Sequence, residues 1–397
     1  MKRGILISIV IGGLFISQNV KAENFNTYYQ NTYNEFKSYN SEFYKYKKRI
    51  DEEFEAYKKI MEEEFENYKK NIEKEWKNPI VPSQKVFVEY SNNYKARKIV
   101  DFNNTTVKIE VLRPQNYKKE LLNNLTELII EKTKDAFKRN PVITNTDKRL
   151  KLIAAGATVI SRPPNSEFII GDILTGKTEI TKKEAEKEAE KILKTAKIIK
   201  SKDKGGTKYT LTFKFPKNKL YLKAREYRPL VVSISQKYNV EYPLVLAIIH
   251  TESSFNPMAV SYIPAYGLMQ IVPQTAGRDV TKNLFGKPMI LTPSYLFNKK
   301  NNINIGTGYL YLLYYKYFSG IKNPESRLLC TIAAYNGGPG SVARAFTGTT
   351  KLYLAEKKIN AMTPKEVYRV LTTRAPMRET RNYVKKVYNR IKFYKNF

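Results

Sequence analysis

The stretch ESSFNPMAVSYIPAYGLMQIVPQTAG, residues 252–277, decides what the C-terminal half of this 397-residue chain can be. An apolar, helix-type run at 244–249 leads directly into Glu252. The dipole at a helix C-terminus favours cations, so a carboxylate there is unfavourable. Apolar neighbours and this dipole both disfavour the charged form, and we therefore expect a raised pKa for Glu252. A carboxyl group that keeps its proton near neutral pH suits general-acid catalysis, whereas a solvated glutamate at a helix end is the competing interpretation.

Five motifs in chain order resemble the lytic transglycosylase family with the soluble-transglycosylase catalytic domain. They are TESSFNP at 251–257, AVS at 259–261, GLMQIVPQTAG at 267–277, AAYNGGPGSV at 333–342 and TRNYVKKV at 380–387. The resemblance extends from about residue 222 to the C-terminus and implies a lysozyme-like helical fold that acts on peptidoglycan. Upstream, KVFVEYSNNYKARKIVDFNNTTVKIEVL at 85–112 is similar to the N-terminal domain of the membrane-bound transglycosylase C branch.

The resemblance implies a role for each matched position. Glu252 matches the acid/base, which protonates the oxygen between N-acetylmuramic acid and N-acetylglucosamine. It then acts as base toward the muramic C6 hydroxyl, which gives a 1,6-anhydromuramic end without consuming water. The matched substrate-binding positions are Ser261 beside the muramic substituents, Met269 and Gln270 at the cleft floor, Tyr335 and Asn336 beside the catalytic carboxyl, and Tyr383 closing the same side.

Some matched positions have a plainer explanation. Ser261, Gln270 and Asn336 are residue types that also serve as turn or cap residues, and this alternative stays open for each. One position departs from the family pattern: Pro264 stands where many relatives have glycine, in a loop beside the cleft. A change in the shape of this loop is expected from the proline, but it removes no reacting group.

Other catalytic chemistries lack the residues they need. The single histidine, His250, lies about 200° around the helix from Glu252, so we expect a packing role rather than a base. The single cysteine, Cys330, lies in an apolar segment and is expected in the core rather than as a nucleophile. One histidine and one cysteine build no Cys/His metal cluster, and no phosphate-binding or dinucleotide-binding glycine pattern is present. We therefore expect neither a metal nor a cofactor.

The scarcity of acids near Glu252 also carries information. Asp279 is the only other acid between Glu252 and Pro324, whereas ordinary glycosidases use two carboxyl groups. A lytic transglycosylase needs only one, and the muramic hydroxyl that attacks is already part of the substrate. The sequence thus favours a peptidoglycan lytic transglycosylase. A goose-lysozyme-like muramidase that hydrolyses the same bond, and a non-catalytic cell-envelope binding protein, are the alternatives.

The N-terminus predicts export. Met1-Lys2-Arg3 is basic, the run from 5 to 16 is apolar but short for a membrane span, and Val20-Lys21-Ala22 has small residues where a signal peptidase cleaves. We expect residues 1–22 to be a signal peptide, with an uncleaved anchor as the alternative, and the protein to act in the periplasm or cell envelope. Members of the C branch are usually lipoproteins, but no cysteine follows the apolar run here, so lipid anchoring is not expected.

Charge defines the candidate partners. The chain has 70 Lys and Arg against 37 Asp and Glu, a net charge of +33. This excess suits nucleic acid, an anionic membrane surface or acidic polymers, while the family resemblance implies peptidoglycan glycan strands as the substrate. Because export is predicted and no known nucleic-acid-binding motif is recognised, we do not expect nucleic acid as a partner. The oligomeric state is left open.

Residues 23–79 predict a long helix with an eleven-residue repeat. The repeat places Phe43, Phe54, Phe65 and Trp76 in one series, Tyr46, Tyr57 and Tyr68 in a second, and Ile50, Met61 and Ile72 in a third. A period of eleven keeps one stripe of a helix nearly straight. The stripe either binds a partner or packs on its own protein, and Pro79 and Pro82 are expected to end the helix.

The expected fold is mainly α. Residues 80–218 predict a small α+β domain with a hairpin at 98–111, helices at 115–138 and 181–197, and a strand at 209–215. Thr181 and Glu184 predict a capping box for the second of these helices. For residues 219–397 the pattern predicts helices, and the resemblance implies a lysozyme-like domain. We expect the middle domain to support or position it.

Overall fold

A computed structural model describes residues 52, 55–153, 159–162, 164–204, 206–262 and 264–397. The expected signal peptide and the repeat positions Phe43, Tyr46, Ile50 and Phe54 lie outside these residues. Residues 56–397 form one compact unit. Across the described ranges, no helix combines the length and apolar character that crossing a bilayer requires.

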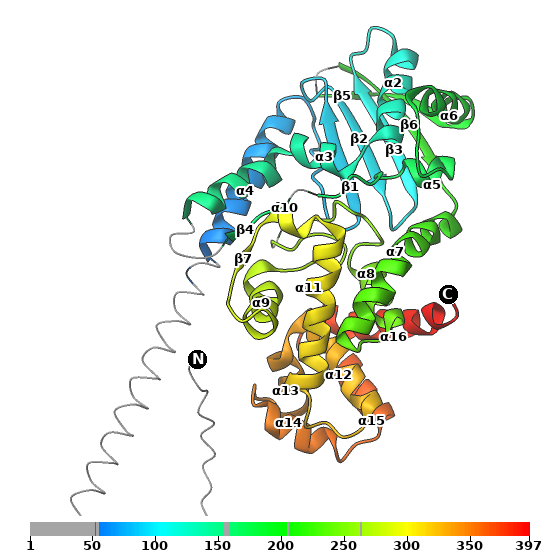
Figure 1. Cartoon of the computed structure of the whole chain (residues 1–397). Coiled ribbons are helices and arrows are strands. Elements are labelled where there is room, and N and C mark those ends of the chain that lie inside the picture. The colour runs from blue at the N-terminus through cyan, green and yellow to red at the C-terminus, as the bar shows by residue number, and fades with distance from the viewer. Residues whose placement is uncertain (1–51, 53–54, 154–158, 163, 205, 263) are drawn as a thin grey trace, which may run out of the picture. The chain divides into compact units, whose positions relative to one another are not determined.

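An antiparallel five-stranded sheet forms the upper part of this unit in Figure 1. Its strands are β1 (Val86–Ser91), β2 (Ala96–Asp101), β3 (Thr106–Leu112), β5 (Lys197–Asp203) and β6 (Gly206–Lys214), in the order β1-β2-β3-β6-β5. The predicted hairpin is confirmed by the β2–β3 register, which pairs Asp101 with Thr106. The predicted strand at 209–215 is confirmed as β6, which pairs with β3. Strand β5 was not predicted, because its largely exposed sequence KIIKSKD has the lysines of a solvated sheet edge rather than an apolar alternation.

Helices α2 (Tyr117–Ile130) and α6 (Lys182–Thr195) lie together beside the sheet, with α2 packed on β2 and β3. The predicted capping box at the start of α6 is present: Thr181 accepts from the Glu184 N–H, and the Glu184 carboxylate accepts from the Thr181 N–H. Four further elements complete the upper part: α3 (Thr133–Arg139), α4 (Pro141–Ile153), α5 (Gly171–Thr175) and β4 (Val159–Ile160), which pairs with β7 (Ile290–Leu291).

The prediction of one continuous helix at 115–138 is wrong. The helix breaks at Glu131 and Lys132 into α2 and α3, and both residues have extended backbone angles. The Glu131 carbonyl accepts from the N–H of Ile169, and Lys132 forms a bridge with Phe168. Hydrogen bonds from a distant segment therefore replace the helical ones, and the local apolar pattern gives no sign of this.

The lower part of the unit is helical. Its helices are α7 (Lys217–Tyr238), α8 (Tyr242–Glu252), α9 (Arg278–Leu284), α10 (Pro293–Leu296), α11 (Lys299–Leu312), α12 (Pro324–Gly337), α13 (Pro339–Thr347), α14 (Leu352–Ile359), α15 (Pro364–Thr373) and α16 (Arg378–Lys395), with π-helical turns at Pro273–Gly277 and Leu313–Tyr317. Helix α8 packs against α7 and α16 and is apolar on almost every side, as expected of a core helix. The mainly α fold predicted from the sequence is confirmed.

The N-terminal helix covers residues 55–73 within the described part of the chain and lies beside α4 (Figure 1). Its repeat positions Tyr57, Met61, Phe65, Tyr68, Ile72 and the following Trp76 are all buried. The rings of Tyr68 and Trp76 contact Tyr90 of β1, so this part of the stripe packs on its own protein. The helix ends at 73 rather than at 79, because the chain must extend toward β1, and the Lys77 N–H already donates to Asp203.

Candidate active site

A cleft of about 770 Å³ gathers most of the residues that the sequence singled out. Five of the seven line it: Glu252, Ser261, Gln270, Tyr335 and Asn336. Tyr383 and Met269 are buried and do not line the cleft. Segments from α8, α12, α16 and the loop between α8 and α9 therefore converge on one space, although 127 positions separate Glu252 from Glu379 of its lining.

Glu252 is the last residue of α8 and is half-buried in the cleft. Directly after it, Ser254 and Phe255 take left-handed backbone conformations, with φ of 50° and 65°. Such angles are strained for a residue as large as phenylalanine. They turn the chain sharply, which leaves the Glu252 carboxyl at the end of an apolar helix with the cleft in front of it.

The pKa of Glu252 is raised to about 7, as the sequence led us to expect. Burial is the main cause; the Tyr383 hydroxyl and then Lys85 oppose it by stabilising the carboxylate, and Glu379 adds to it through repulsion. The raised pKa lets the carboxyl keep its proton near neutral pH more readily than an ordinary glutamate, so both the donor form and the acceptor form are available.

Two tyrosines lie behind the carboxyl, with different partners. The buried Tyr383 hydroxyl on α16 lies close enough to Glu252 to lower the pKa of that carboxyl, and it forms no regular hydrogen bond with any of the described residues. The Tyr335 hydroxyl on α12 donates instead to the Met269 carbonyl, at 2.9 Å. Burial, and after it the nearby Glu252, raise the pKa of both phenols, so both stay protonated. Tyr383, rather than Tyr335, is thus placed to orient the carboxyl.

The remaining predicted residues form the walls and their supports. Gln270 has a φ of 48°, and its amide nitrogen donates to the carbonyls of Ala259 and Gly267. Asn336 accepts from the Thr380 hydroxyl at 2.7 Å and donates to Glu379 at 3.3 Å, which ties α12 to α16. Met269, expected at the cleft floor, packs its side chain next to Gly306 of α11 and supports the floor from behind.

The cleft also contains residues that the sequence did not single out. Phe65 comes from the N-terminal helix, residues 81–85 come from the segment before β1, and Glu379 comes from α16. Phe65 contacts Tyr262, with ring centroids 5.8 Å apart, and Asn256 donates to the Gln84 carbonyl at 3.2 Å. No local pattern marks these residues as functional, because only the fold brings them close to Glu252.

The single histidine and cysteine take the structural roles expected of them. His250 is hydrogen-bonded to the Tyr394 hydroxyl, and its pKa is lowered to about 3, mainly by burial. Cys330 is fully buried, which raises the pKa of its thiol. Within the described part of the chain, no group of three His, Cys, Asp or Glu side chains is placed to hold a metal.

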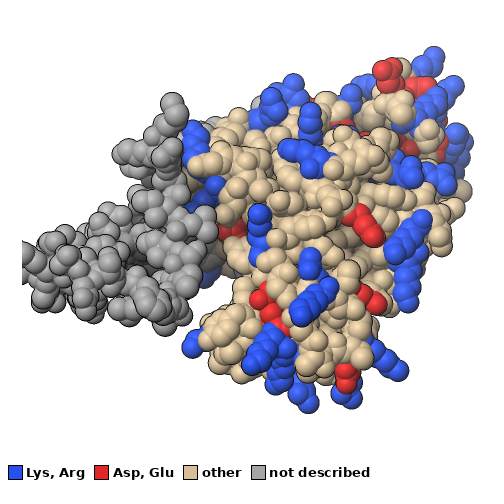
Figure 2. Space-filling model, turned by 60° about the horizontal axis from the view of Figure 1, so that its bottom comes forward, with Lys and Arg blue, Asp and Glu red and all other residues tan. Residues whose placement is uncertain are grey.

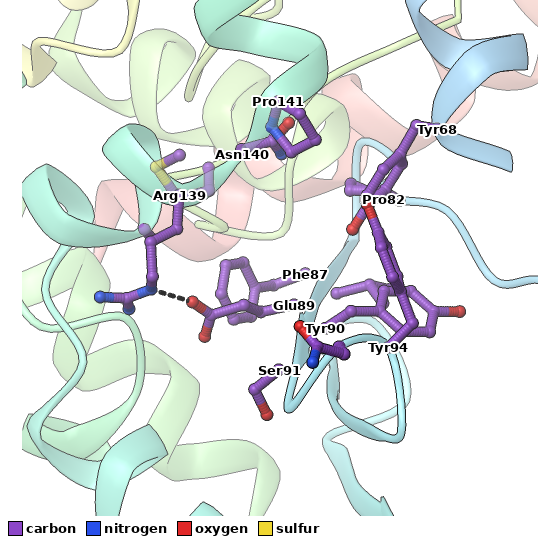
Figure 3. A pocket seen from close by; sticks show the side chains of 14 residues that line it. Tyr68, Pro82, Phe87, Glu89, Tyr90, Ser91, Tyr94, Arg139, Asn140 and Pro141 are labelled. Carbon is purple, nitrogen blue, oxygen red and sulfur yellow. Dashed lines mark hydrogen bonds and ion pairs between the residues drawn. The ribbon is translucent and has the colours of Figure 1, made fainter. Parts of the chain in front are cut away.

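A second pocket, of about 320 Å³, lies between the N-terminal helix, β1 and the start of α4 (Figure 3). Tyrosines 68, 90 and 94 form one side, and Arg139 donates to Glu89 on the other. Glu89 also pairs with Lys98. The charges at the centre of this pocket are thus already paired within the protein. This makes the pocket the weaker candidate for an active site.

Comparisons with known proteins identify the family of this chain. Residues 229–356 match the transglycosylase SLT domain, and residues 47–138 match the N-terminal domain of membrane-bound lytic murein transglycosylase C. The membrane-bound lytic murein transglycosylase C of Actinobacillus succinogenes is 34% identical over 313 residues, 78% of this chain and 81% of that protein. The one of Klebsiella pneumoniae subsp. pneumoniae is 35% identical over 320 residues, 80% and 83%. The structure of the 70 kDa soluble lytic transglycosylase SLT70 of Escherichia coli is 29% identical with a TM-score of 0.34, covering 43% of this chain and 24% of that one.

Proposed function

This chain belongs to the membrane-bound lytic murein transglycosylase C family, and we propose that it cleaves the β-1,4 bond between N-acetylmuramic acid and N-acetylglucosamine with formation of 1,6-anhydromuramic ends. Glu252 is the acid/base in this proposal. Ser261, Gln270, Tyr335 and Asn336 contact the glycan or shape its cleft, while Met269 and Tyr383 act from behind it.

The observation that carries the proposal is a half-buried carboxyl with a pKa of about 7 in a cleft large enough for sugar rings. As acid, Glu252 gives its proton to the bridging oxygen, and the C1–O bond breaks. As base, the resulting carboxylate takes the proton of the muramic C6 hydroxyl, whose oxygen bonds to C1. Tyr383 donates to the carboxylate form, which holds it in place between the two steps.

Mass analysis of the products is the direct test. The purified protein, incubated with peptidoglycan sacculi, is expected to release muropeptides that are each lighter by one water molecule than hydrolysis products. Products with a reducing muramic end would instead support the muramidase alternative. Binding to sacculi without any release would support a non-catalytic envelope protein.

One observation keeps the hydrolase alternative in view. Counting acids along the sequence left Asp279 as the only second carboxyl, but the cleft contains Glu379, which acts electrostatically on Glu252. Glu379 is exposed and accepts a hydrogen bond from Asn336. A second carboxyl group at this position is the kind of group that a hydrolase uses to activate water.

The location of the protein is part of the proposal. On the face shown in Figure 2, separate groups of Lys and Arg side chains are scattered among other residues and outnumber those of Asp and Glu. Together with the net charge of +33, this supports attraction to anionic polymers or lipid surfaces of the cell envelope. We place the protein in the periplasm, after export directed by residues 1–22.

The rate of cleavage is expected to fall with rising pH. The first step needs protonated Glu252, so kcat should decrease about tenfold per pH unit well above the pKa of about 7. A rate profile between pH 5 and 9 on solubilised glycan strands tests this. A rate that stays constant up to pH 9 would show that the donor is another group.

Replacing Tyr383 by phenylalanine is expected to lower kcat about tenfold, since the carboxylate form of Glu252 loses the hydroxyl that stabilises it. The Tyr383 hydroxyl lowers the Glu252 pKa, so its removal should also move the alkaline limb of the profile to higher pH. The matched control is Tyr335→Phe, whose hydroxyl bonds to a backbone carbonyl instead. In Tyr335→Phe the alkaline limb of the pH–rate profile should not move. A limb that moves in Tyr335→Phe but not in Tyr383→Phe would assign the positioning role to Tyr335.

A further inference from the structure

Lysine ammonium groups that are strongly buried in this protein have acidic partners close by. Lys98 lies 2.7 Å from Glu89, and Lys223 lies 2.7 Å from Asp172. The less buried Lys299 lies 3.0 Å from Glu167. This pairing is expected, because an ammonium group removed from water is costly unless a carboxylate or a hydrogen-bond acceptor replaces the water.

Lys85 departs from this rule. Its side chain is half-buried and lines the cleft with Glu252, yet among the described residues its ammonium forms no hydrogen bond or ion pair. Its backbone is nevertheless fixed, because the Lys85 carbonyl accepts from Phe102 at 2.9 Å and the neighbouring Gln84 carbonyl accepts from Asn256. A cation held in place in a cleft, without a partner in the protein, is a site for an anion from outside.

The charges around Lys85 strengthen this conclusion. Burial lowers its pKa, and the like charges of Lys386 and Arg390 on α16 lower it further. Two acids oppose this, Glu252 and Asp101. Glu252 is only partly ionised at neutral pH, and Asp101 already accepts two hydrogen bonds from Asn104. A bound carboxylate would supply the missing negative charge and relieve the repulsion among three cations.

We propose that Lys85 binds a carboxylate on the muramic residue at the cleavage point, and that it thereby selects strands that carry a negative charge there. The inference rests on the proposed function. The muramic sugar differs from its neighbour by a lactyl ether, whose carboxylate is free on a peptide-free strand and becomes an amide when a stem peptide is attached. A stem peptide carries carboxylates of its own, farther from the ring. Lys85 lies beside Glu252 in the cleft that Ser261 also lines, so the nearer lactyl carboxylate fits best.

Binding to an inactive protein separates this inference from catalysis. The full-length Glu252→Gln variant keeps the shape of the protonated carboxyl and holds strands without cutting them. Calorimetry would compare short peptide-free strands with free lactyl carboxylates, the same strands with these groups converted to primary amides, and peptide-bearing strands. The acid form is expected to bind about tenfold more tightly than the amide form, which is typical of a charge-assisted hydrogen bond.

Adding Lys85→Gln should remove this preference, so that acid and amide strands bind equally. Lys85→Arg should retain most of it, and the control Lys108→Gln, an exposed lysine on β3, should retain all of it. A preference that survives in Lys85→Gln would overturn the inference, as would a wild-type background that binds both peptide-free forms equally. A Lys85-dependent preference for peptide-bearing strands alone would overturn the lactyl assignment and place the carboxylate on the peptide. The proposed function is judged separately, by whether the wild type releases anhydro products.

Discussion

Glutamine at position 252 is expected to lower kcat/KM for release of anhydromuramic ends about a thousandfold, the usual order for loss of general acid-base catalysis. The amide has the shape of the protonated carboxyl but neither gives nor takes the proton. Cleavage of solubilised glycan strands, followed by separation of the products and their mass analysis, measures the effect.

Folding is not expected to account for this loss. Burial raises the pKa of folded Glu252 above its ordinary value of 4.5, so the folded state binds more protons than the unfolded one between pH 4.5 and 7. Stability from this group is present below pH 4.5 and is lost as pH rises through about 7. The neutral Glu252→Gln protein should therefore unfold at the same or a higher denaturant concentration than the wild type at pH 8.

Glu379→Gln is the matched control, because this second carboxyl lines the same cleft but lies exposed at the start of α16. With one acid/base, the variant should keep anhydro products and most of the rate. Loss of activity in both variants, together with reducing ends in the wild-type products, would show a two-carboxylate hydrolase. Full activity in Glu252→Gln would remove Glu252 from the mechanism.

Site features that depend on residues close in sequence could be predicted, whereas features that depend on residues far apart in sequence could not. The direction of the Glu252 pKa shift could be predicted because an apolar helix ends at this residue, although burial by the folded chain is the main cause of the shift. The approach of Glu379 and Lys85 could not, since the first is 127 positions after Glu252 and the second 167 positions before it. Their residue types are common on any surface of a chain this rich in charge.

The same distinction applies to the fold. Thr181 and Glu184 determine a helix start within four residues, and that prediction is confirmed. The break after Ile130 arises from pairing with 168–169, which no local pattern contains. For the stripe of the N-terminal helix, the repeat predicted which face is apolar but left open what covers it. In the structure, Tyr90 and Tyr94 contact Tyr68 and Trp76 of this stripe, and Tyr262 contacts its Phe65.

Trp76 is the residue at which this stripe joins the sheet, and its replacement by alanine is expected to destabilise the protein by about 3–5 kcal/mol, the usual range for a buried large aromatic. The indole is fully buried, its N–H donates to the Tyr94 carbonyl, and the Arg97 guanidinium lies 3.9 Å from the ring centroid. The substitution leaves a cavity and leaves the Tyr94 carbonyl without its partner. The buried Arg97–Glu110 ion pair then faces this cavity. Denaturant unfolding of the full chain measures the loss.

Two further variants separate packing from other causes. Trp76→Phe keeps an aromatic ring but loses the N–H donor, so it should cost less than alanine, by the share of the cavity it fills. Lys70→Ala, at an exposed position of the same helix, should leave stability within about 0.5 kcal/mol of the wild type. Because Phe65 of this helix lines the cleft, a destabilised Trp76→Ala protein should also bind glycan strands more weakly. Unchanged stability in Trp76→Ala would mean that packing of the aromatic stripe on its own protein does not stabilise the fold. It would then favour the interpretation that the stripe binds a partner.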